Sequence, residues 1–468
     1  MCRWRWLAVA ARRASRFCAM IQSSKHSEIP MLVSLTEKRL CLTILLLYLV
    51  AGALYAIYTP AWQLPDEPAH YNYIRQLVED GCCPRIETGD WSSEYLAQLT
   101  SSRFAPKLLD ELASIQYEDH HPPLYYMLAS LVYRLTAGDL IALRLFSLTL
   151  GAGVVALSYL ISRRLLPAQP QVALGVMALV AFLPQHLHML SAVNNDALAE
   201  LLVGLTLLWL LRYLDGEHAP VWQLGILVGL ALLTKLTIYF LALLAPLAIW
   251  LRWRQTQAAP RALLRSLAVF AAIALLIGGL WQLRNISVYG FPDLLGLAAH
   301  DAVVADQPRT ADYIRVQGAG PYLAQMLGTT FKSFWGQFGW MALPLDQVLG
   351  GWIYRGFALL TLAGASGALL SARRRPAADG WLILLAALLI TLLQFGYYNL
   401  EFQQWQGRYL FPALIPIACA LVCGLDWWRA RLLSRWQAAR WLIPLALSSL
   451  FVLDLYLLAR VIVPGLSP

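Results

Sequence analysis

The chain has few charged residues. Asp, Glu, Lys and Arg together make up 13% of its 468 residues, whereas soluble domains carry about 25%. Hydrophobic residues make up 59%, and the mean hydropathy is +0.57. This composition argues against a cytosolic globular enzyme, and the repeated apolar stretches near twenty residues have the length of a helix that crosses a bilayer. The sequence therefore predicts an all-α polytopic membrane protein.

The seven cysteines form no CxxC pair and no Cys/His group at zinc-ligand spacing. Neither a disulfide framework nor a structural zinc site is therefore expected. Cys82 and Cys83 are adjacent without an assigned role, and Cys419 and Cys423 are expected to pack as small residues on one helix face. The net charge of +9 collects between apolar runs, where it orients membrane spans. Membrane lipids, and no nucleic acid, are the expected surroundings.

Three parts of the chain are expected: a basic cytoplasmic leader, 1–39, a single transmembrane domain, 40–462, and a tail, 463–468. The apolar run 7–11 is too short for a signal core, and Met20 or Met31 could be the true start. About 11–13 transmembrane helices are expected. Twelve apolar segments are found, at 40–58, 122–136, 140–162, 171–190, 196–213, 222–234, 236–251, 264–283, 352–370, 381–398, 409–427 and 441–462.

The distribution of charge predicts on which side of the membrane each polar segment lies. Arginines collect at 252–265, 373–375 and 429–440, which places these segments in the cytoplasm. The outer loops are then 59–121, 284–350 and about 399–408, and together they could roof one cavity. Loop 59–121 has helical patterns at 65–81, 91–99 and 106–117, which predict short helices on the membrane surface. One inconsistency remains, because two apolar segments separate this loop from Arg163 where an odd number is needed, unless 122–136 does not cross fully.

Polar residues that could carry chemistry collect at the predicted outer ends of the spans. Asp66 and Glu67 follow the first span, and Asp66 shares a helix face with His70. A structural alternative is that Asp66 caps the helix and Glu67 favours its positive end. His120 and His121 precede two prolines at the next entry to the membrane.

Further candidates follow later in the chain. Tyr125 could belong either to a site or to the interfacial aromatic belt, and Asn195 and Asp196 could bind substrate or cap a helix. Lys235 interrupts an apolar run and could simply snorkel. The remaining candidates, at the outer ends of two spans, are Arg284, Asn285, Arg408 and Tyr409. Because arginine presents a rigid fork of donors suited to phosphate, these positions indicate an anionic lipid headgroup, with surface anchoring as the alternative.

Over most of residues 40–430 the chain resembles the GT-C membrane glycosyltransferases, which include protein O-mannosyltransferases and lipid A aminoarabinose transferases. The order and spacing of several short motifs carry the resemblance. They are Asp66-Glu67, His121 to Tyr126, Arg144-Leu145 through Arg163-Arg164-Leu165, Asn195 to Leu198, Gly229 to Lys235, Arg284-Asn285 and Gly407 to Pro412. The form around Asp66 is most similar to that of uncharacterised bacterial members.

The resemblance implies a polyprenyl-phosphate-linked sugar as donor and a reaction at the outer face of a plasma membrane. Asp66 matches the catalytic aspartate and would be the general base of an inverting transfer. Glu67 is expected to be catalytic with it, either by positioning the acceptor or by accepting hydrogen bonds from a sugar. Because the leaving phosphate is already a stable anion, cationic groups matter more than a second acid. No cofactor is firmly implied and no metal site is assigned, although His70 with Asp66, Asp196, His120 or His121 leaves a divalent ion conceivable.

Two other classes of function stay open. A transporter or flippase of a lipid-linked sugar would place its binding groups near the bilayer midplane and show repeated halves; the chain shows no internal repeat, and its polar groups lie at span ends. A catalytically dead scaffold is the other. The sequence identifies neither the sugar nor the acceptor, which could be a glycan, a lipid or a protein.

Overall fold

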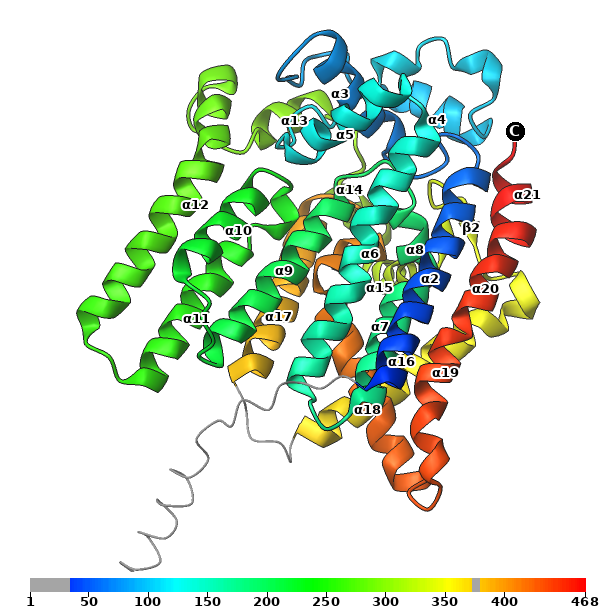
Figure 1. Ribbon diagram of the computed structural model, residues 1–468. Coiled ribbons are helices and arrows are strands. Elements are labelled where there is room, and N and C mark those ends of the chain that lie inside the picture. The colour runs from blue at the N-terminus through cyan, green and yellow to red at the C-terminus, as the bar shows by residue number, and fades with distance from the viewer. Residues whose placement is uncertain (1–33, 373–378) are drawn as a thin grey trace, which may run out of the picture. The chain divides into compact units, whose positions relative to one another are not determined.

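The computed structural model describes residues 34–372 and 379–468, and this part of the chain is mostly helical. Residues 1–33 of the predicted leader and Arg373, Arg374 and Arg375 therefore lie outside the described residues. The chain divides into a unit that ends at Leu40 and a unit 41–468. One helix, Leu35–Tyr58, begins in the first unit and continues into the second, and all later helices and strands belong to the second unit (Figure 1).

All twelve predicted apolar segments are helical, which confirms the all-α membrane class. Nine spans in the described residues are long and apolar enough to cross a bilayer. They are α2 (Leu35–Tyr58), α6 (Leu140–Leu165), α9 (Asp196–Leu214), η3 with α11 (Leu236–Thr256), α12 (Pro260–Tyr289), η4 with α16 (Val348–Ala372), α17 (Asp379–Glu401), η5 (Gly407–Ala413) with α18 (to Leu432), and the run η6, α19, α20, η7 and α21 (Gln437–Leu466).

A tenth span is a broken one. Helices α7 (Pro170–Phe182) and α8 (Pro184–Leu190) are bent by 61°. Pro184 begins the second of them, because proline lacks the amide hydrogen that would continue the first. The two remaining segments are the short helices α5 (Leu124–Thr136) and α10 (Val221–Leu232).

The short helix α5 removes the inconsistency in the predicted crossings. Its 13 residues extend about 20 Å, less than the hydrocarbon core of about 30 Å. The helices on either side of it, α2 and α6, run antiparallel: Tyr48 of α2 meets Gly151 of α6, and Ala56 accepts a hydrogen bond from Arg144. One crossing by α2 is therefore followed directly by the opposite crossing of α6.

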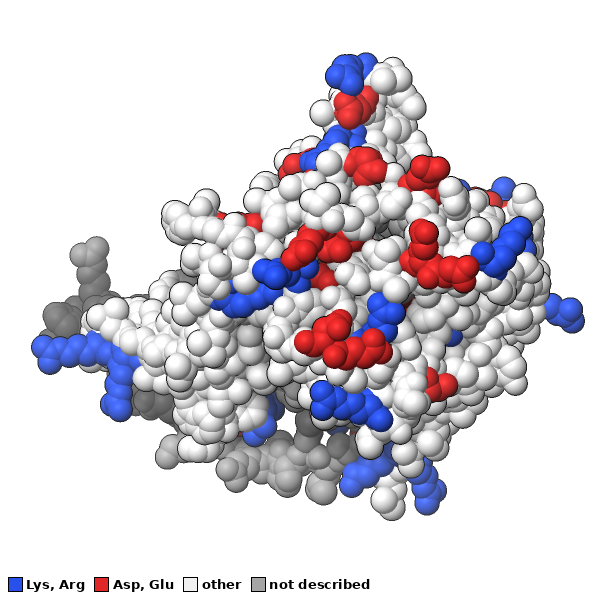
Figure 2. Space-filling model, turned by 90° about the horizontal axis from the view of Figure 1, so that it is seen from above, with Lys and Arg blue, Asp and Glu red and all other residues white. Residues whose placement is uncertain are grey.

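The arginine-rich helix ends lie together. Arg164, at the end of α6, pairs with Asp215 and Glu217 after α9, and Gln255, at the end of α11, bonds Asp379 at the start of α17. The polar segments lie at the other end of the helices, with α3 (Glu67–Glu79), α4 (Ser93–Ser101) and α13 (Leu297–Val303) (Figure 1). Seen from that end, acidic side chains gather near the middle of the surface with basic ones beside them (Figure 2).

The first two polar loops fold against each other. Leu99, Phe104 and Tyr117 form a buried cluster with Val304, so α4, predicted to lie on the membrane surface, packs into a loop core. This core also includes the short helices η1 (Pro106–Leu108) and η2 (Leu112–Ser114). The second loop continues through α14 (Thr310–Gln317), α15 (Ala319–Trp335) and the paired strands β1 (Gln337–Phe338) and β2 (Leu343–Pro344).

The last residues differ from the predicted tail. Helix α21 (Val463–Leu466) continues the preceding span instead of ending it at 462. Gln63 donates a hydrogen bond of 2.9 Å to the Leu466 carbonyl, and Arg103 donates one of 3.0 Å to the Ser467 carbonyl. The final turn therefore bonds the first polar loop.

Candidate functional site

Asp66 stands at the N-terminus of α3 in the left-handed backbone region, with φ 65° and ψ −2°. This conformation is uncommon for residues other than glycine, although aspartate adopts it more readily than most. The carboxylate does not cap its helix, as the structural alternative required. One oxygen accepts a hydrogen bond of 2.8 Å from the Tyr117 hydroxyl, and the other is bound by the Arg408 guanidinium. The left-handed backbone thus presents the carboxylate away from its own helix.

A polar cavity of about 220 Å³ opens beside this pair. Residues from all three polar segments line it, as predicted. The lining includes Asp66, Trp91, Tyr117, Glu118, His300, Gln307, Trp340, Gln404, Gln406, Arg408 and Tyr409. The buried Nε of Arg408 has no hydrogen-bond partner within residues 34–372 and 379–468. The guanidinium that lines the cavity therefore keeps one N–H group without a protein acceptor.

Asp66, His70 and Glu118 could hold a metal ion together, because their ligand atoms lie within 4.8 Å of one another. Their present partners are protein groups. His70 Nδ1 is 2.9 Å from the Tyr126 hydroxyl, and His121 Nε2 is 2.7 Å from a Glu118 oxygen. A cation would have to displace Arg408 or Tyr117 from Asp66. The donor set suits a divalent ion, but the carboxylate at its centre is already satisfied.

Burial changes the pKa values of several groups in these loops. Desolvation lowers the pKa of His70 to about 4 and holds that of His120 well below its usual range, so both rings are neutral at pH 7. Desolvation also raises the pKa of Asp119 to about 8. Burial alone would raise the pKa of Glu118, but the neighbouring His121 keeps it well below its usual range.

A second carboxylate and cation lie just behind the cavity. Lys235 Nζ is 2.6 Å from Asp196 Oδ1, at the start of α9. Lys235 stands at the break between α10 and η3, which frees its side chain from a regular helix. Asp196 also interacts electrostatically with Arg408. The predicted residues Asp196, Lys235 and Arg408 therefore belong to one charged network with Asp66.

Glu67, predicted to be catalytic with Asp66, does not reach the cavity. Its carboxylate is fully buried and forms two hydrogen bonds, of 2.7 and 2.6 Å, with Arg144. It also accepts the backbone amides of Trp62 and Val193. Arg144 in turn donates to the carbonyls of Ala56, Thr59 and Pro60. Glu67 therefore joins the end of α2 to α6, a role that adjacency to Asp66 did not predict.

Three more predicted residues, Tyr125, Asn195 and His120, lie outside the cavity wall. The Tyr125 hydroxyl bonds Ser147 at 2.8 Å and accepts the Asn194 amide. Asn195 donates to the Tyr126 hydroxyl at 3.1 Å. His120 bonds the Tyr117 carbonyl at 3.1 Å and its ring contacts those of His121 and His300. None of the three lines the cavity: His120 contacts Tyr117 and His300 of its wall, Asn195 reaches His70 only through Tyr126, and the hydrogen-bond partners of Tyr125 lie outside the wall.

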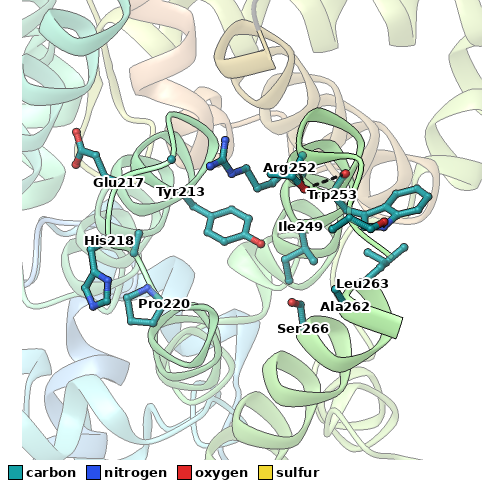
Figure 3. A pocket seen from close by; sticks show the side chains of 14 residues that line it. Tyr213, Glu217, His218, Pro220, Ile249, Arg252, Trp253, Ala262, Leu263 and Ser266 are labelled. Atoms are coloured by element: carbon teal, nitrogen blue, oxygen red, sulfur yellow. Dashed lines mark hydrogen bonds between the residues drawn. The ribbon is translucent and has the colours of Figure 1, made fainter. Parts of the chain in front are cut away.

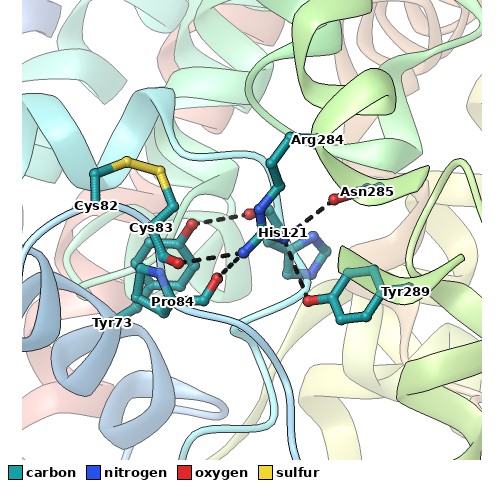
Figure 4. The surroundings of a disulfide bond; sticks show 8 residues. All are labelled: Tyr73, Cys82, Cys83, Pro84, His121, Arg284, Asn285 and Tyr289. Atoms are coloured by element: carbon teal, nitrogen blue, oxygen red, sulfur yellow. Dashed lines mark hydrogen bonds between the residues drawn. A yellow bond between two sulfur atoms is a disulfide. The ribbon is translucent and has the colours of Figure 1, made fainter. Parts of the chain in front are cut away.

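Arg284 and Asn285 lie outside the cavity. Arg284 binds the backbone carbonyls of Cys83 and Pro84 (Figure 4). Its guanidinium also lies over the Trp281 ring, 4.6 Å from the ring centroid. Asn285 donates to the Leu294 carbonyl at 3.1 Å. Neither of these predicted substrate-binding residues lines the Asp66 cavity, and the carbonyls of Cys83 and Pro84, in the turn that contains Cys82, occupy the guanidinium of Arg284. These two cysteines form a disulfide, which the spacing argument did not predict.

The sequence argument missed most of the cavity wall. Tyr117 and Glu118 are separated from Asp66 by the four helices α3, α4, η1 and η2, and Trp91 and Trp340 come from different loops. The only local signal was the polar run that ends in His120 and His121. The aromatic residues carried no signal, because tryptophan is common at membrane interfaces.

Residues 120–278 match a family model described as dolichyl-phosphate-mannose-protein mannosyltransferase. Among solved structures, the chain is similar to ArnT from Cupriavidus metallidurans bound to undecaprenyl phosphate, with a TM-score of 0.50 and 14% identity over 91% of this chain and 73% of that one. The Saccharomyces cerevisiae protein O-mannosyltransferase Pmt1-Pmt2 complex bound to the sugar donor matches at 19% identity and a TM-score of 0.37, over 56% of this chain and 35% of that one. No curated protein matches the sequence. The ArnT match confirms the predicted GT-C fold.

Proposed function

We propose that the protein is a glycosyltransferase that moves a sugar from a polyprenyl-phosphate-linked donor to an acceptor at the outer face of the membrane. The observation that carries this proposal is the contact of Asp66 with Arg408 inside a small polar cavity at one end of the helices. The GT-C fold and the family match over residues 120–278 support the class of reaction.

The cavity can supply both groups that the transfer needs. The acceptor hydroxyl loses its proton to Asp66 while its oxygen bonds the anomeric carbon, and the bond from that carbon to the phosphate oxygen breaks. The polyprenyl phosphate leaves with one more negative charge, which Arg408 and Lys235 stabilise. Attack opposite the leaving group inverts the anomeric centre. Because the base takes the acceptor proton and the leaving phosphate is stable, no second acid is required.

The contact between Asp66 and Arg408 would change during the reaction. In the structure the guanidinium binds one oxygen of the carboxylate. A donor phosphate competes for the same guanidinium, since arginine binds phosphate through two parallel hydrogen bonds. Donor binding then frees the carboxylate oxygen to accept the proton. In this proposal Glu67 positions the start of α3 through Arg144 and takes no proton itself.

The placement at the outer face rests on charge. The arginine-rich helix ends lie opposite the cavity, and arginine favours the cytoplasmic side. A transporter would hold its ligand near mid-depth, whereas this cavity lies among the loops at the helix ends.

The proposal is tested by lipid and glycan analysis of cells that produce wild-type protein, Asp66→Asn or no protein. We expect Asp66→Asn and the null strain to accumulate the same polyprenyl-phosphate sugar and to lack the same glycosylated product. The matched control is Asp110→Asn, an exposed aspartate of the same loop, which should behave as wild type. Unchanged donor and glycan pools, together with a solute that fails to cross the membrane, would favour the transporter.

A further inference from the structure

A second cavity, of about 360 Å³, lies at the arginine-rich end of the helices. Its volume falls within the range of about 300–1,000 Å³ found for small-molecule sites. The wall is formed by the end of α9, the turn 215–220, the last turns of α11 and the start of α12 (Figure 3). The proposed transfer reaction uses none of its residues.

Arg252 provides the positive charge of this cavity. It is half-buried and donates to the Leu214 carbonyl at 3.3 Å and to Gln255 at 3.1 Å. Within the described ranges no carboxylate pairs with it. The one carboxylate of the wall, Glu217, already pairs with Arg164 and Arg212, at 2.5 and 2.8 Å. Glu217 is therefore neutralised by two arginines, whereas Arg252 has no acidic partner among the described residues. The cavity consequently attracts anions.

The wall also holds free hydrogen-bond donors. Across the residues that the structure describes, the hydroxyls of Tyr213 and Ser266 form no hydrogen bond, and both side chains line the space next to Arg252 (Figure 3). The turn is shaped around the guanidinium. Gly216 has φ +82°, and a Cβ there would lie 2.5 Å from an Arg252 nitrogen. Any larger residue at this position would push the guanidinium out of its place.

The side chains beside the cavity are of the kinds that favour the headgroup region of a membrane. Arg254 stacks on Trp250 at 4.8 Å, and Trp253 donates to the Ala258 carbonyl; arginine and tryptophan at helix ends are typical of the membrane interface. Leu264, on the next helix, is 66% exposed, as expected for a side chain that faces acyl chains. Basic pockets between transmembrane helices bind anionic headgroups.

We propose that this cavity binds the phosphate headgroup of an anionic phospholipid, with Arg252 as the cation and the Tyr213 and Ser266 hydroxyls as further donors. The acyl chains would then run along the exposed apolar surface of α12. The site would act as a lipid anchor at the end of the helices opposite Asp66. It does not depend on the proposed transfer reaction.

Native mass spectrometry of the delipidated full chain tests the proposal. Phosphatidylglycerol, phosphatidylcholine and glycerol phosphate are added separately to wild type and to Arg252→Gln. We expect phosphatidylglycerol to bind wild type in preference to phosphatidylcholine, and Arg252→Gln to bind it about tenfold more weakly, the loss expected for one charge-assisted hydrogen bond. Arg435→Gln, an exposed arginine outside the cavity, is the matched control and should bind as wild type.

Equal loss in Arg252→Gln and Arg435→Gln would overturn the proposal, because binding would then reflect surface charge alone. Equal affinity for glycerol phosphate and phosphatidylglycerol would overturn the lipid as the ligand. If Arg252→Gln does not fold, the double variant Tyr213→Phe with Ser266→Ala keeps the cation and removes both free hydroxyls. It should weaken phosphatidylglycerol binding at least about fivefold, by the loss of two neutral hydrogen bonds, and unchanged binding would count against the site.

Discussion

Arg408 binds the carboxylate of Asp66 across 342 residues of sequence. This contact joins the loop after the first span to the start of α18 and closes one wall of the polar cavity. Both side chains belong to networks that continue beyond the pair, Asp66 through Tyr117 and Arg408 through its electrostatic interaction with Asp196. Substitutions in these networks should distinguish residues that act on the sugar donor from residues that stabilise the folded protein.

Arg408→Ala should reduce transfer about 100-fold, the effect typical of removing one donor that stabilises developing negative charge. The loss should appear in the dependence on donor concentration, because the guanidinium is expected to bind the donor phosphate. Arg408→Lys keeps the positive charge but lacks the paired donors of the guanidinium, so its transfer rate should lie between those of wild type and Arg408→Ala. Turnover measured against donor concentration checks this. Arg315→Ala, an exposed arginine, is the control, and an unchanged donor dependence in Arg408→Ala would defeat the assignment.

Glu67→Gln should act mainly by lowering the stability of the folded protein and not by removing a group that takes part in the transfer reaction. The side chains of Glu67 and Arg144 are 0% and 2% exposed, and loss of one partner of a buried ion pair costs about 3–5 kcal/mol because the other charge stays unpaired. Thermal unfolding in detergent measures the loss. Asp312→Asn breaks an exposed pair with Arg315 and should cost less than about 1 kcal/mol. A Glu67→Gln protein with wild-type unfolding and no activity would show instead that Glu67 takes part in the reaction.

Asp119 should make stability fall as the pH rises. Burial raises its pKa from 3.8 in the unfolded chain to about 8 in the folded one, so the folded state holds a proton that the unfolded state has lost. The stabilisation is complete below the unfolded pKa and is lost as the pH rises through the folded value. His70, whose pKa is lowered to about 4, is neutral in both states at higher pH and adds no slope there.

Unfolding temperatures at about pH 7 and about pH 9 measure this effect. Asp119→Asn should flatten the difference, because an amide has no proton to lose in this range. Asp110→Asn, at an exposed position in the same loop, should leave the difference unchanged. The same slope in wild type and Asp119→Asn would show that another group titrates.

Chelation tests whether Asp66, His70 and Glu118 work through a metal ion. We expect turnover to survive EDTA, because Arg408 and Tyr117 already bind both oxygens of Asp66. Turnover is measured after chelation and after addition of Mn²⁺ or Mg²⁺. Loss on chelation with recovery on Mn²⁺, and no recovery in His70→Gln, would instead establish the three residues as metal ligands.

Cysteine labelling of intact cells tests the side of the cavity. Lys107 lies in the loop that carries Asp66, and Arg435 lies among the arginines at the opposite end; both are exposed. A maleimide that does not cross membranes should label Lys107→Cys and not Arg435→Cys, each compared with the unsubstituted protein for background labelling. The reverse pattern would place the cavity in the cytoplasm.

Much of the architecture could be predicted because it depends on local composition. A stretch of twenty apolar residues forms a helix in lipid whatever its neighbours are, since every backbone polar group must be satisfied within the segment. The twelve segments and the short helix after Glu67 were predicted on this basis, whereas the GT-C fold was predicted from the resemblance that the motifs carry. Motif order likewise predicted that Asp66, Asp196, Lys235 and Arg408 would act together, although no two of them are close in sequence.

The partners of each charge depended on the tertiary structure. Asp66 and Glu67 are neighbours in sequence, yet the left-handed backbone of Asp66 directs one carboxylate to Arg408 in the cavity and leaves the other with Arg144 in the interior. Arg284 and Arg408 both stand at span ends, but only the guanidinium of Arg284 is bound by nearby backbone carbonyls. Sequence alone determined the helices, their apolar faces and the polar segments between them. Only the packing of distant loops decided which charges meet, because a long charged side chain takes the nearest partner in space.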